Sequence, residues 1–179
     1  MRKIITIAAI VVVLALVLAL GLAALQSGTF NVRRTASIKA PPDKIFAMID
    51  DFHQWGAWSP YEKLDPAMQR SFSGAASGKG AVYAWDGESG TVGSGRMEIT
   101  DTSPSSKIVI KLDFFKPLEG HNTAEFTITP QGDSNNVTWA MYGPKPYLSK
   151  IMGLFFSMDS MIGKDFETGL ANLKAVAEK

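Results

Sequence analysis

The chain has 179 residues, no cysteine and a formal net charge of +1. Without cysteine it has no disulfide, no thiolate metal site and no cysteine nucleophile, so the stability of its folded part must come from packing. The near-zero charge gives no electrostatic case for binding nucleic acid or an anionic lipid surface.

The chain begins with a long apolar segment, Ile4 to Leu25, whose 22 residues carry no charge. At about 1.5 Å per residue, a helix of this length spans about 33 Å, enough to cross a hydrocarbon core of about 30 Å. Arg2 and Lys3 precede the segment and place the N-terminus in the cytoplasm. We therefore predict a signal-anchor transmembrane helix within residues 1–27. The rest of the chain would lie on the extracytoplasmic side, which is the periplasm in a Gram-negative bacterium.

The alternative to an anchor is a cleaved signal peptide, which also begins with positive charge. Its apolar region would run for about 7 to 15 residues and end in a small-x-small cleavage site. The apolar run here is longer, and the segment Leu22 to Leu25 matches such a site poorly. These features favour the anchor. A lipoprotein anchor is excluded because there is no cysteine to acylate.

Residues 28–179 are enough for one domain with a sizeable core. Alternation of apolar and polar residues from Thr29 to Lys39 predicts a first strand. Pro41 and Pro42 then indicate a turn and the start of a short helix, because proline is tolerated in the first helical turn. A second short helix or loop is expected to follow, running through Trp55 and Trp58.

The middle of the domain is rich in strands that are separated by short turn-forming clusters of Gly, Pro, Ser, Asn and Asp. Connections of this length favour antiparallel hairpins over crossovers. Six strands are expected, near Met68–Phe72, Ala81–Trp85, Gly93–Thr100, Lys107–Phe114, Glu119–Pro130 and Asn136–Tyr142.

From Pro146 onward the apolar residues recur every three or four positions, which predicts a C-terminal helix of about 30 residues. Glycine weakens a helix, so a break is expected near Gly153 or Gly163. The order of elements predicts an α+β fold, in which a seven-stranded curved antiparallel sheet closes around this helix. A cavity between the sheet and the helix is a natural consequence of that arrangement.

Three segments of the domain resemble motifs of one known superfamily. They are the strand and helix start from Ile38 to Phe46, the W-x-x-W-S-P segment from Trp55 to Tyr61, and the final helix from Gly163 to Lys174. In this order, they resemble the START-like (SRPBCC) superfamily, specifically its polyketide cyclase/dehydrase and lipid transport branch, over about residues 30 to 178. The resemblance implies a helix-grip fold around a hydrophobic cavity. Members of the superfamily carry sterols, lipids or quinones, bind plant metabolites or cyclise polyketides, so the fold does not select the function.

The polar residues give little support for a catalytic or metal site. His53 and His121 stand alone, without the spacing of a metal motif, so no metal and no cofactor is predicted. Asp159 lies beside the apolar stripe of the last helix, where a partly buried carboxylate would need a partner or a raised pKa.

Aromatic and methionine side chains give the positive signal, because aromatic walls with adaptable methionines suit a flat or long apolar ligand. Trp55 and Phe166 belong to the same aromatic set, part of which must simply be core. The candidates for lining a ligand cavity are Trp58, Tyr61, Trp85, Phe114, Trp139, Tyr142, Phe155, Met158 and Met161, with Asp159 beside them.

Three functions remain open on the sequence. The first is a membrane-tethered binding module for a hydrophobic small molecule such as a lipid or quinone. The second is an enzyme of cyclase or hydratase type that uses the same cavity with a lone acid or base, Asp159 or His121. The third is an envelope interaction protein whose core is filled by its own side chains.

Overall fold

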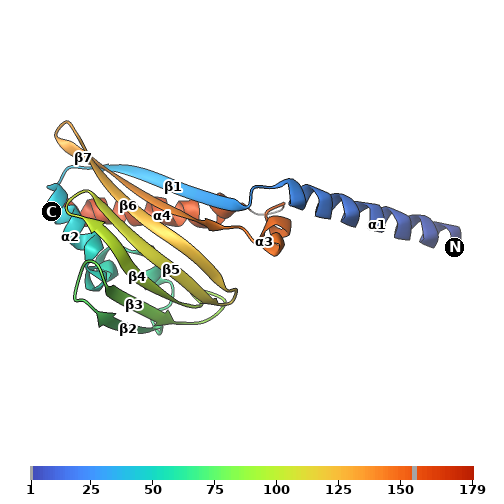
Figure 1. The fold of residues 1–179 in the computed structure, drawn as a ribbon, viewed down its shortest axis with the longest axis horizontal. Helices are drawn as coiled ribbons and strands as arrows, with labels where there is room; N and C mark the ends of the chain where they lie inside the picture. The colour runs from blue at the N-terminus through green and yellow to red at the C-terminus, as the bar shows by residue number, and fades with distance from the viewer. Residues whose placement is uncertain (1, 155–156) are drawn as a thin grey trace.

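The computed structural model describes residues 2–154 and 157–179. A long N-terminal helix, α1, projects away from a domain in which a curved sheet closes over the C-terminal helix (Figure 1). The helices are α1 (Arg2–Leu25), α2 (Pro42–Asp50), α3 (Tyr147–Met152) and α4 (Met158–Ala177), with two short 3-10 helices, η1 (Phe52–Ala57) and η2 (Pro60–Lys63). The strands are β1 (Thr29–Ile38), β2 (Gln69–Gly74), β3 (Ala81–Asp86), β4 (Ser94–Ser103), β5 (Lys107–Lys116), β6 (Gly120–Gln131) and β7 (Ser134–Pro144).

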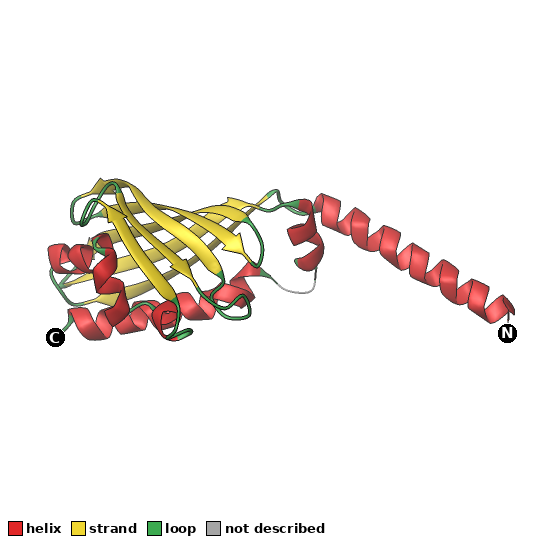
Figure 2. Cartoon of the chain, turned by 90° about the horizontal axis from the view of Figure 1, so that it is seen from below, coloured by secondary structure: helices red, strands yellow, loops and turns green. Residues whose placement is uncertain are grey.

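Within the described residues, seven strands form one antiparallel sheet in the order β1-β7-β6-β5-β4-β3-β2. From β2 to β7 neighbours in sequence are neighbours in space, as the short turns predicted. The register of β4 against β5 shifts at two places, between Ser94 and Gly95 and between Ile99 and Asp101. Such irregularities bend a strand, and the sheet curves around α4 (Figure 2). The predicted α+β helix-grip fold is confirmed.

The C-terminal segment forms two helices, where the sequence predicted one long helix with a break. The break follows Met152, close to the predicted position at Gly153, and α4 continues without interruption through Gly163. Ser157 caps α4, because its side chain accepts a hydrogen bond from the backbone N–H of Ser160. The apolar stripe is therefore shared between two helices that lie in different surroundings.

The core lies between the sheet and α4. Phe166, Leu170 and Leu173 of α4 are each at most 1% exposed and pack against the inner face of the sheet. All side chains of this core cluster, and those packed against it, come from residues 30–177. Helix α1 contributes none of them, so the domain carries its complete core without α1.

The segments nearest to α1 lie at one end of the sheet. Pro144 at the end of β7 pairs with Thr29, which follows α1 closely. The β5–β6 turn and the β3–β4 loop lie at the same end, because β5 and β3 run parallel to β7 in the sheet. Helix α2 and the C-terminus lie at the opposite end (Figures 1 and 2). We call the first of these the α1 end of the domain.

Gly169 controls how closely α4 approaches the sheet. A Cβ atom at this position would lie 2.7 Å from Cζ3 of Trp139 and 3.0 Å from Cδ of Pro60. We expect Gly169→Ala to lower the free energy of unfolding by about 1–2 kcal/mol, because overpacking costs about 1–3 kcal/mol and the better helix propensity of alanine returns up to about 1 kcal/mol. The measurement is urea unfolding of residues 28–179, followed by tryptophan fluorescence.

The matched control is Gly56→Ala in η1, where nothing lies within 4 Å of the added Cβ atom. Equal unfolding free energies for the Gly169 and Gly56 variants would contradict the close approach of α4 to Trp139.

Candidate functional site

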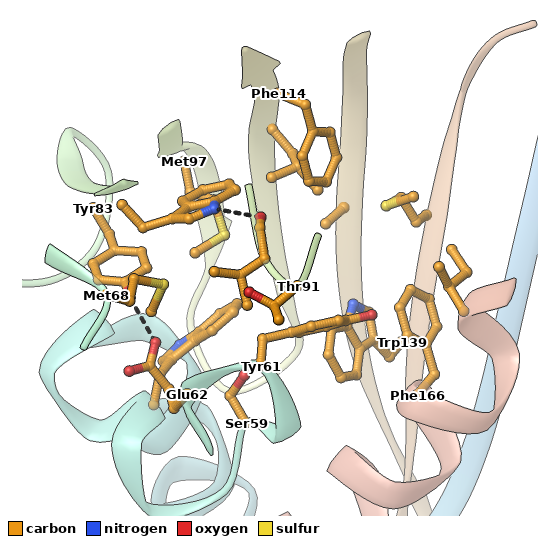
Figure 3. A pocket seen from close by; sticks show the side chains of 17 residues that line it. Ser59, Tyr61, Glu62, Met68, Tyr83, Thr91, Met97, Phe114, Trp139 and Phe166 are labelled. Carbon is orange, nitrogen blue, oxygen red and sulfur yellow. Dashed lines mark hydrogen bonds between the residues drawn. The ribbon is translucent and has the colours of Figure 1, made fainter. Parts of the chain in front are cut away.

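A cavity of about 210 Å³ lies between the inner face of the sheet and the helices α4, η1 and η2 (Figure 3). Its walls are mostly aromatic and aliphatic side chains. They come from η1 and η2, from β3 to β7, from the β3–β4 loop and from the first half of α4. The cavity therefore occupies the place in the fold where a cavity was expected.

The deep wall of the cavity is a stack of aromatic rings. The ring of Trp139 on β7 lies parallel to that of Phe166 on α4, with centroids 4.2 Å apart and an interplanar angle of 6°. On the other side, Trp139 stacks on Phe126 at 5.0 Å. Tyr61 of η2 meets Trp139 edge-on at 6.4 Å, and Figure 3 shows it reaching toward Trp139. Such a stack offers a flat and rigid apolar surface.

The opposite wall is built around Trp85 on β3. A Cβ atom on Gly95 would lie 2.5 Å from the Trp85 ring, so glycine is required on β4 for the ring to lie across that strand. The indole N–H of Trp85 donates to the carbonyl of Val92 at 3.1 Å, which holds the β3–β4 loop against the ring. Phe114 on β5 meets Trp85 edge-on at 5.8 Å.

The mouth of the cavity lies toward the α1 end of the domain. Trp85, Val92, Phe114 and Ile162 line the cavity and are only partly buried, whereas Met97 and Met141 are buried deeper in the wall. Val92 belongs to the β3–β4 loop, and Phe114 lies near the end of β5, close to the β5–β6 turn. Both are at the α1 end. The opening therefore faces the side of the domain from which α1 projects.

One polar group in the wall is a carboxylate held by two partners. Glu62 of η2 accepts a hydrogen bond from the hydroxyl of Tyr83 at 2.6 Å and another from Nε of Arg70 at 2.7 Å. Its side chain is 11% exposed. Burial, and then the hydrogen bond to Glu62, raises the pKa of Tyr83 above its ordinary value. The carboxylate is neutralised by Arg70, which leaves this corner without a free charge.

Two further polar groups face the aromatic stack. Burial, followed by the negative charge of Asp165, raises the pKa of the Tyr61 hydroxyl. Trp139 is 4% exposed, and its Nε1 has no hydrogen-bond partner among the described residues. A buried donor without a partner costs about 1–3 kcal/mol, which an acceptor oxygen would relieve.

Four of the ten predicted cavity residues line the cavity: Tyr61, Trp85, Phe114 and Trp139. Trp58 is fully buried behind the wall instead, where its indole N–H donates to the carbonyl of Met48 at 2.9 Å. Tyr142 points to the outer face of the sheet, because it follows the inward-facing Met141 by one residue.

The other candidates on the C-terminal segment do not reach the cavity. Met158 packs against the rim of the core and Met161 is 56% exposed. Asp159 is exposed and forms an ion pair with Arg34 of β1, with Oδ1 2.7 Å from Nη1. Hydrogen bonds from that guanidinium lower the pKa of Asp159, so it has the partner that the sequence required but stands outside the cavity. Phe155 lies outside the described residues.

The histidines stand on the outside of the domain. Nδ1 of His121 lies 2.8 Å from Oδ1 of Asp113, and Nδ1 of His53 lies 2.8 Å from Oδ1 of Asp51. Neither histidine lines the cavity. Across residues 2–154 and 157–179, no group of His, Asp and Glu side chains is arranged to hold a metal ion.

Several residues that line the cavity were not among the candidates predicted from the sequence, notably Glu62, Met68, Met97, Ala124 and Met141. Strand alternation carries the signal for some of them. Met97, Ala124 and Met141 each lie two residues from another buried apolar residue of the same strand, and so share its inward face. The position of Glu62 depends on its pairing with Arg70 and Tyr83, for which the sequence offers no signal.

Comparison with protein families identifies the family to which this domain belongs. The model of the family described as polyketide cyclase/dehydrase and lipid transport matches residues 29–178. The chain belongs to this family. Among curated proteins, none matches the sequence.

Solved structures show the same fold at low sequence identity. The di-domain aromatase/cyclase BexL of the BE-7585A biosynthetic pathway superposes with a TM-score of 0.64 at 16% identity, over 89% of this chain and 53% of BexL. The di-domain StfQ of the steffimycin pathway superposes with a TM-score of 0.60 at 14% identity, over 84% of this chain and 51% of StfQ. Protein CV1439 from Chromobacterium violaceum superposes with a TM-score of 0.58 at 14% identity, over 83% of this chain and 97% of the CV1439 chain. At these identities the likeness supports the fold alone.

The raised pKa values of Tyr61 and Tyr83 predict a loss of stability at high pH. The folded state keeps both phenols neutral, whereas the unfolded chain releases their protons near pH 10. The stabilisation is complete below about pH 10 and falls as the pH rises further, by up to about 1.4 kcal/mol per pH unit for each tyrosine.

We expect the double variant Tyr61→Phe/Tyr83→Phe to flatten this loss. The measurement is the urea midpoint of residues 28–179 between pH 8 and 11.5, compared with the wild type. Parallel curves for the two proteins above pH 10 would show that these phenols are not held neutral by the fold.

Proposed function

We propose that the protein is a membrane-tethered binding module for a hydrophobic small molecule, held in the cavity between the sheet and α4. The observation that carries this proposal is the cavity itself, whose walls are apolar and preformed. A filled core would serve equally well for stability, since close packing is the rule in protein interiors. An open apolar space of this size is therefore a feature that needs an occupant.

The size of the cavity limits the ligand. About 210 Å³ exceeds the roughly 150 Å³ of an engineered apolar cavity that holds benzene, and lies below the roughly 300–1,000 Å³ of drug-sized pockets. The cavity therefore suits one or two fused rings, or a length of hydrocarbon chain whose remainder leaves through the mouth. Each 100 Å² of apolar ligand surface removed from water contributes about 2.5 kcal/mol.

The polar groups of the wall supply orientation. The unpaired N–H of Trp139 lies at the deep stack and would favour a ligand that carries an acceptor oxygen, such as a carbonyl or an ether. Glu62 already has two donors, so it has little capacity left for a ligand. A ring system with a carbonyl group, as in a quinone, meets both requirements.

The membrane tether is proposed from α1. Ile4–Leu25 is one helix in the structure, long and apolar enough to span a bilayer. Its side chains from 11 to 18 are exposed, so the domain does not use them for its core. A lipid environment is the natural partner for such a surface. Residues 1–27 would then form the anchor, and residues 28–179 the binding domain on the extracytoplasmic side.

Residues 2–154 and 157–179 give no comparable observation in favour of catalysis. Asp159 and His121, the two groups on which the enzyme hypothesis relied, both stand outside the cavity. The carboxylate that does line it, Glu62, is ion-paired with Arg70 at 2.7 Å. A ligand in the cavity would therefore meet mainly apolar walls.

Filling the cavity tests the proposal. Ala124 on β6 lines the cavity and is 3% exposed, so a leucine there would extend into the open space. We expect Ala124→Leu in residues 28–179 to bind the bicyclic probe N-phenyl-1-naphthylamine at least tenfold more weakly than the wild type. The measurement is a fluorescence titration of the probe, together with native mass spectrometry of both proteins as purified from a membrane-containing host.

The matched control is Ala84→Leu on β3, which adds the same side chain outside the cavity lining. Thermal unfolding of both variants verifies that they fold. Probe affinity that is unchanged in folded Ala124→Leu would remove this cavity as the binding site. A wild-type protein that binds no probe and purifies without a bound compound would favour the interaction protein.

The tether has its own test. We expect the full chain, expressed in a Gram-negative host, to stay in the membrane fraction after alkaline carbonate extraction, because a spanning helix resists removal. Protease added to spheroplasts should digest the domain, which would place it outside the cytoplasm. A mature protein whose mass begins after the apolar segment would show that the segment is a cleaved signal peptide instead.

A further inference from the structure

Helix α3 exposes apolar side chains that the domain does not bury. Tyr147, Leu148 and Met152 are 47%, 60% and 43% exposed. They lie on one short helix, although their spacing in the sequence continues the apolar stripe that α4 buries in the core. An apolar helix surface left outside the core is costly in water and indicates a partner.

Helix α3 and the residues just before it are bonded to the last turns of α1 and to the link that follows it. The hydroxyl of Tyr147 donates to the backbone carbonyl of Leu20 at 2.8 Å, and Nζ of Lys145 donates to Oε1 of Gln26 at 2.6 Å. The backbone N–H of Lys145 also donates to the carbonyl of Gly28 at 2.7 Å. Ala23 of α1 is fully buried. These contacts fix the position of α3 along the axis of α1.

That position corresponds to the edge of a bilayer. Leu20 precedes the end of the apolar segment by five residues, which is about 7.5 Å of helix. If the segment spans the hydrocarbon core, the Tyr147 hydroxyl lies just inside its boundary. Tyrosine is enriched at this depth in membrane proteins, and amphipathic helices lie there with their apolar side chains about 5–10 Å into the lipid.

The β5–β6 turn adds apolar side chains at the same end of the domain. Phe115 and Leu118 are 53% and 57% exposed. Phe115 lies near the end of β5 and Leu118 in the turn between β5 and β6, close in sequence to Phe114 at the cavity mouth. Figures 1 and 2 show this turn and α3 on the side of the domain from which α1 leaves. Both groups of exposed apolar residues therefore lie at the end of the domain toward which the mouth opens.

We propose that α3 is a second membrane element, lying in the lipid interface beside the exit of α1, and that it turns the cavity mouth toward the bilayer. This inference rests on the proposed membrane span of α1. Its partner is the apolar edge of a lipid bilayer, because the exposed side chains are apolar and Lys145 already has a partner in Gln26. A ligand dissolved in the membrane could then enter the cavity without crossing water.

The absence of cysteine allows a direct test on the full chain, because a single introduced cysteine carries a label at one site only. We would label Leu148→Cys with the fluorophore NBD and reconstitute the protein in phosphatidylcholine nanodiscs, with and without 5-doxyl phosphatidylcholine as a quencher. Leu14→Cys reports the proposed span, and Asp133→Cys reports the opposite end of the sheet, where its side chain is 76% exposed.

We expect the doxyl lipid to reduce the fluorescence of NBD at position 148 at least twofold and to leave position 133 unchanged. Quenching at position 14 together with none at 148 would overturn the role of α3 and leave the tether intact. If NBD at position 14 is exposed to water and is not quenched by the doxyl lipid, the proposed tether is wrong, and this inference is wrong with it.

A second measurement tests the orientation of the mouth. With NBD at Leu118→Cys, the added substitution Leu148→Glu should reduce quenching at least twofold, because a charge is expelled from the lipid interface. Ala171→Glu is the matched control, since it adds the same charge to the exposed surface of α4. Equal quenching in the two Glu variants would show that α3 does not orient the domain.

Discussion

The parallel stack of Trp139 on Phe166 is the contact on which the rest of the domain depends. It joins β7, which pairs with both β1 and β6, to the helix that closes the sheet. Gly169 allows this distance, since any side chain there would meet Trp139. The stack thereby fixes the separation of α4 from the sheet. That separation in turn decides how much space is left toward the α1 end.

The inner face of the sheet is filled at one end and open at the other for a physical reason. Near the opposite end, α2 adds Ile45 and Ile49, both fully buried, to the side chains that α4 contributes. Toward the α1 end, α4 offers Ile162, and in the described part of the chain only the short 3-10 helices η1 and η2 lie over the cavity beside it. Aromatic rings and methionines line this region, and their large, flat or flexible shapes leave a cavity between them.

The fold could be predicted closely because alternation in the strands and turn residues between them are local signals. The residues of the site were harder to predict, because a shift of one residue along a strand moves a side chain to the other face of the sheet. Trp139 and Tyr142 differ in this way, although both looked suitable. Asp159 was separated from the cavity by its pairing with Arg34, a residue 125 positions away, which no local pattern reveals. Along the apolar stripe from Pro146, by contrast, Gly153 was a local signal, and it correctly indicated the division into α3 and α4.

That division follows from the path of the chain. β7 ends at the α1 end of the sheet and α4 begins there, so the chain must turn back where α1 leaves the domain. In water, an apolar turn at this place would be unfavourable. Beside a bilayer it is stable, and one continuous apolar pattern can then serve two environments. Phe166 and Leu170 pack in the protein core, while Leu148 and Met152 are exposed and, in the proposed arrangement, would face lipid. On this view, the tether and the cavity belong to one arrangement, in which the span sets the depth of α3 and α3 sets the direction of the mouth.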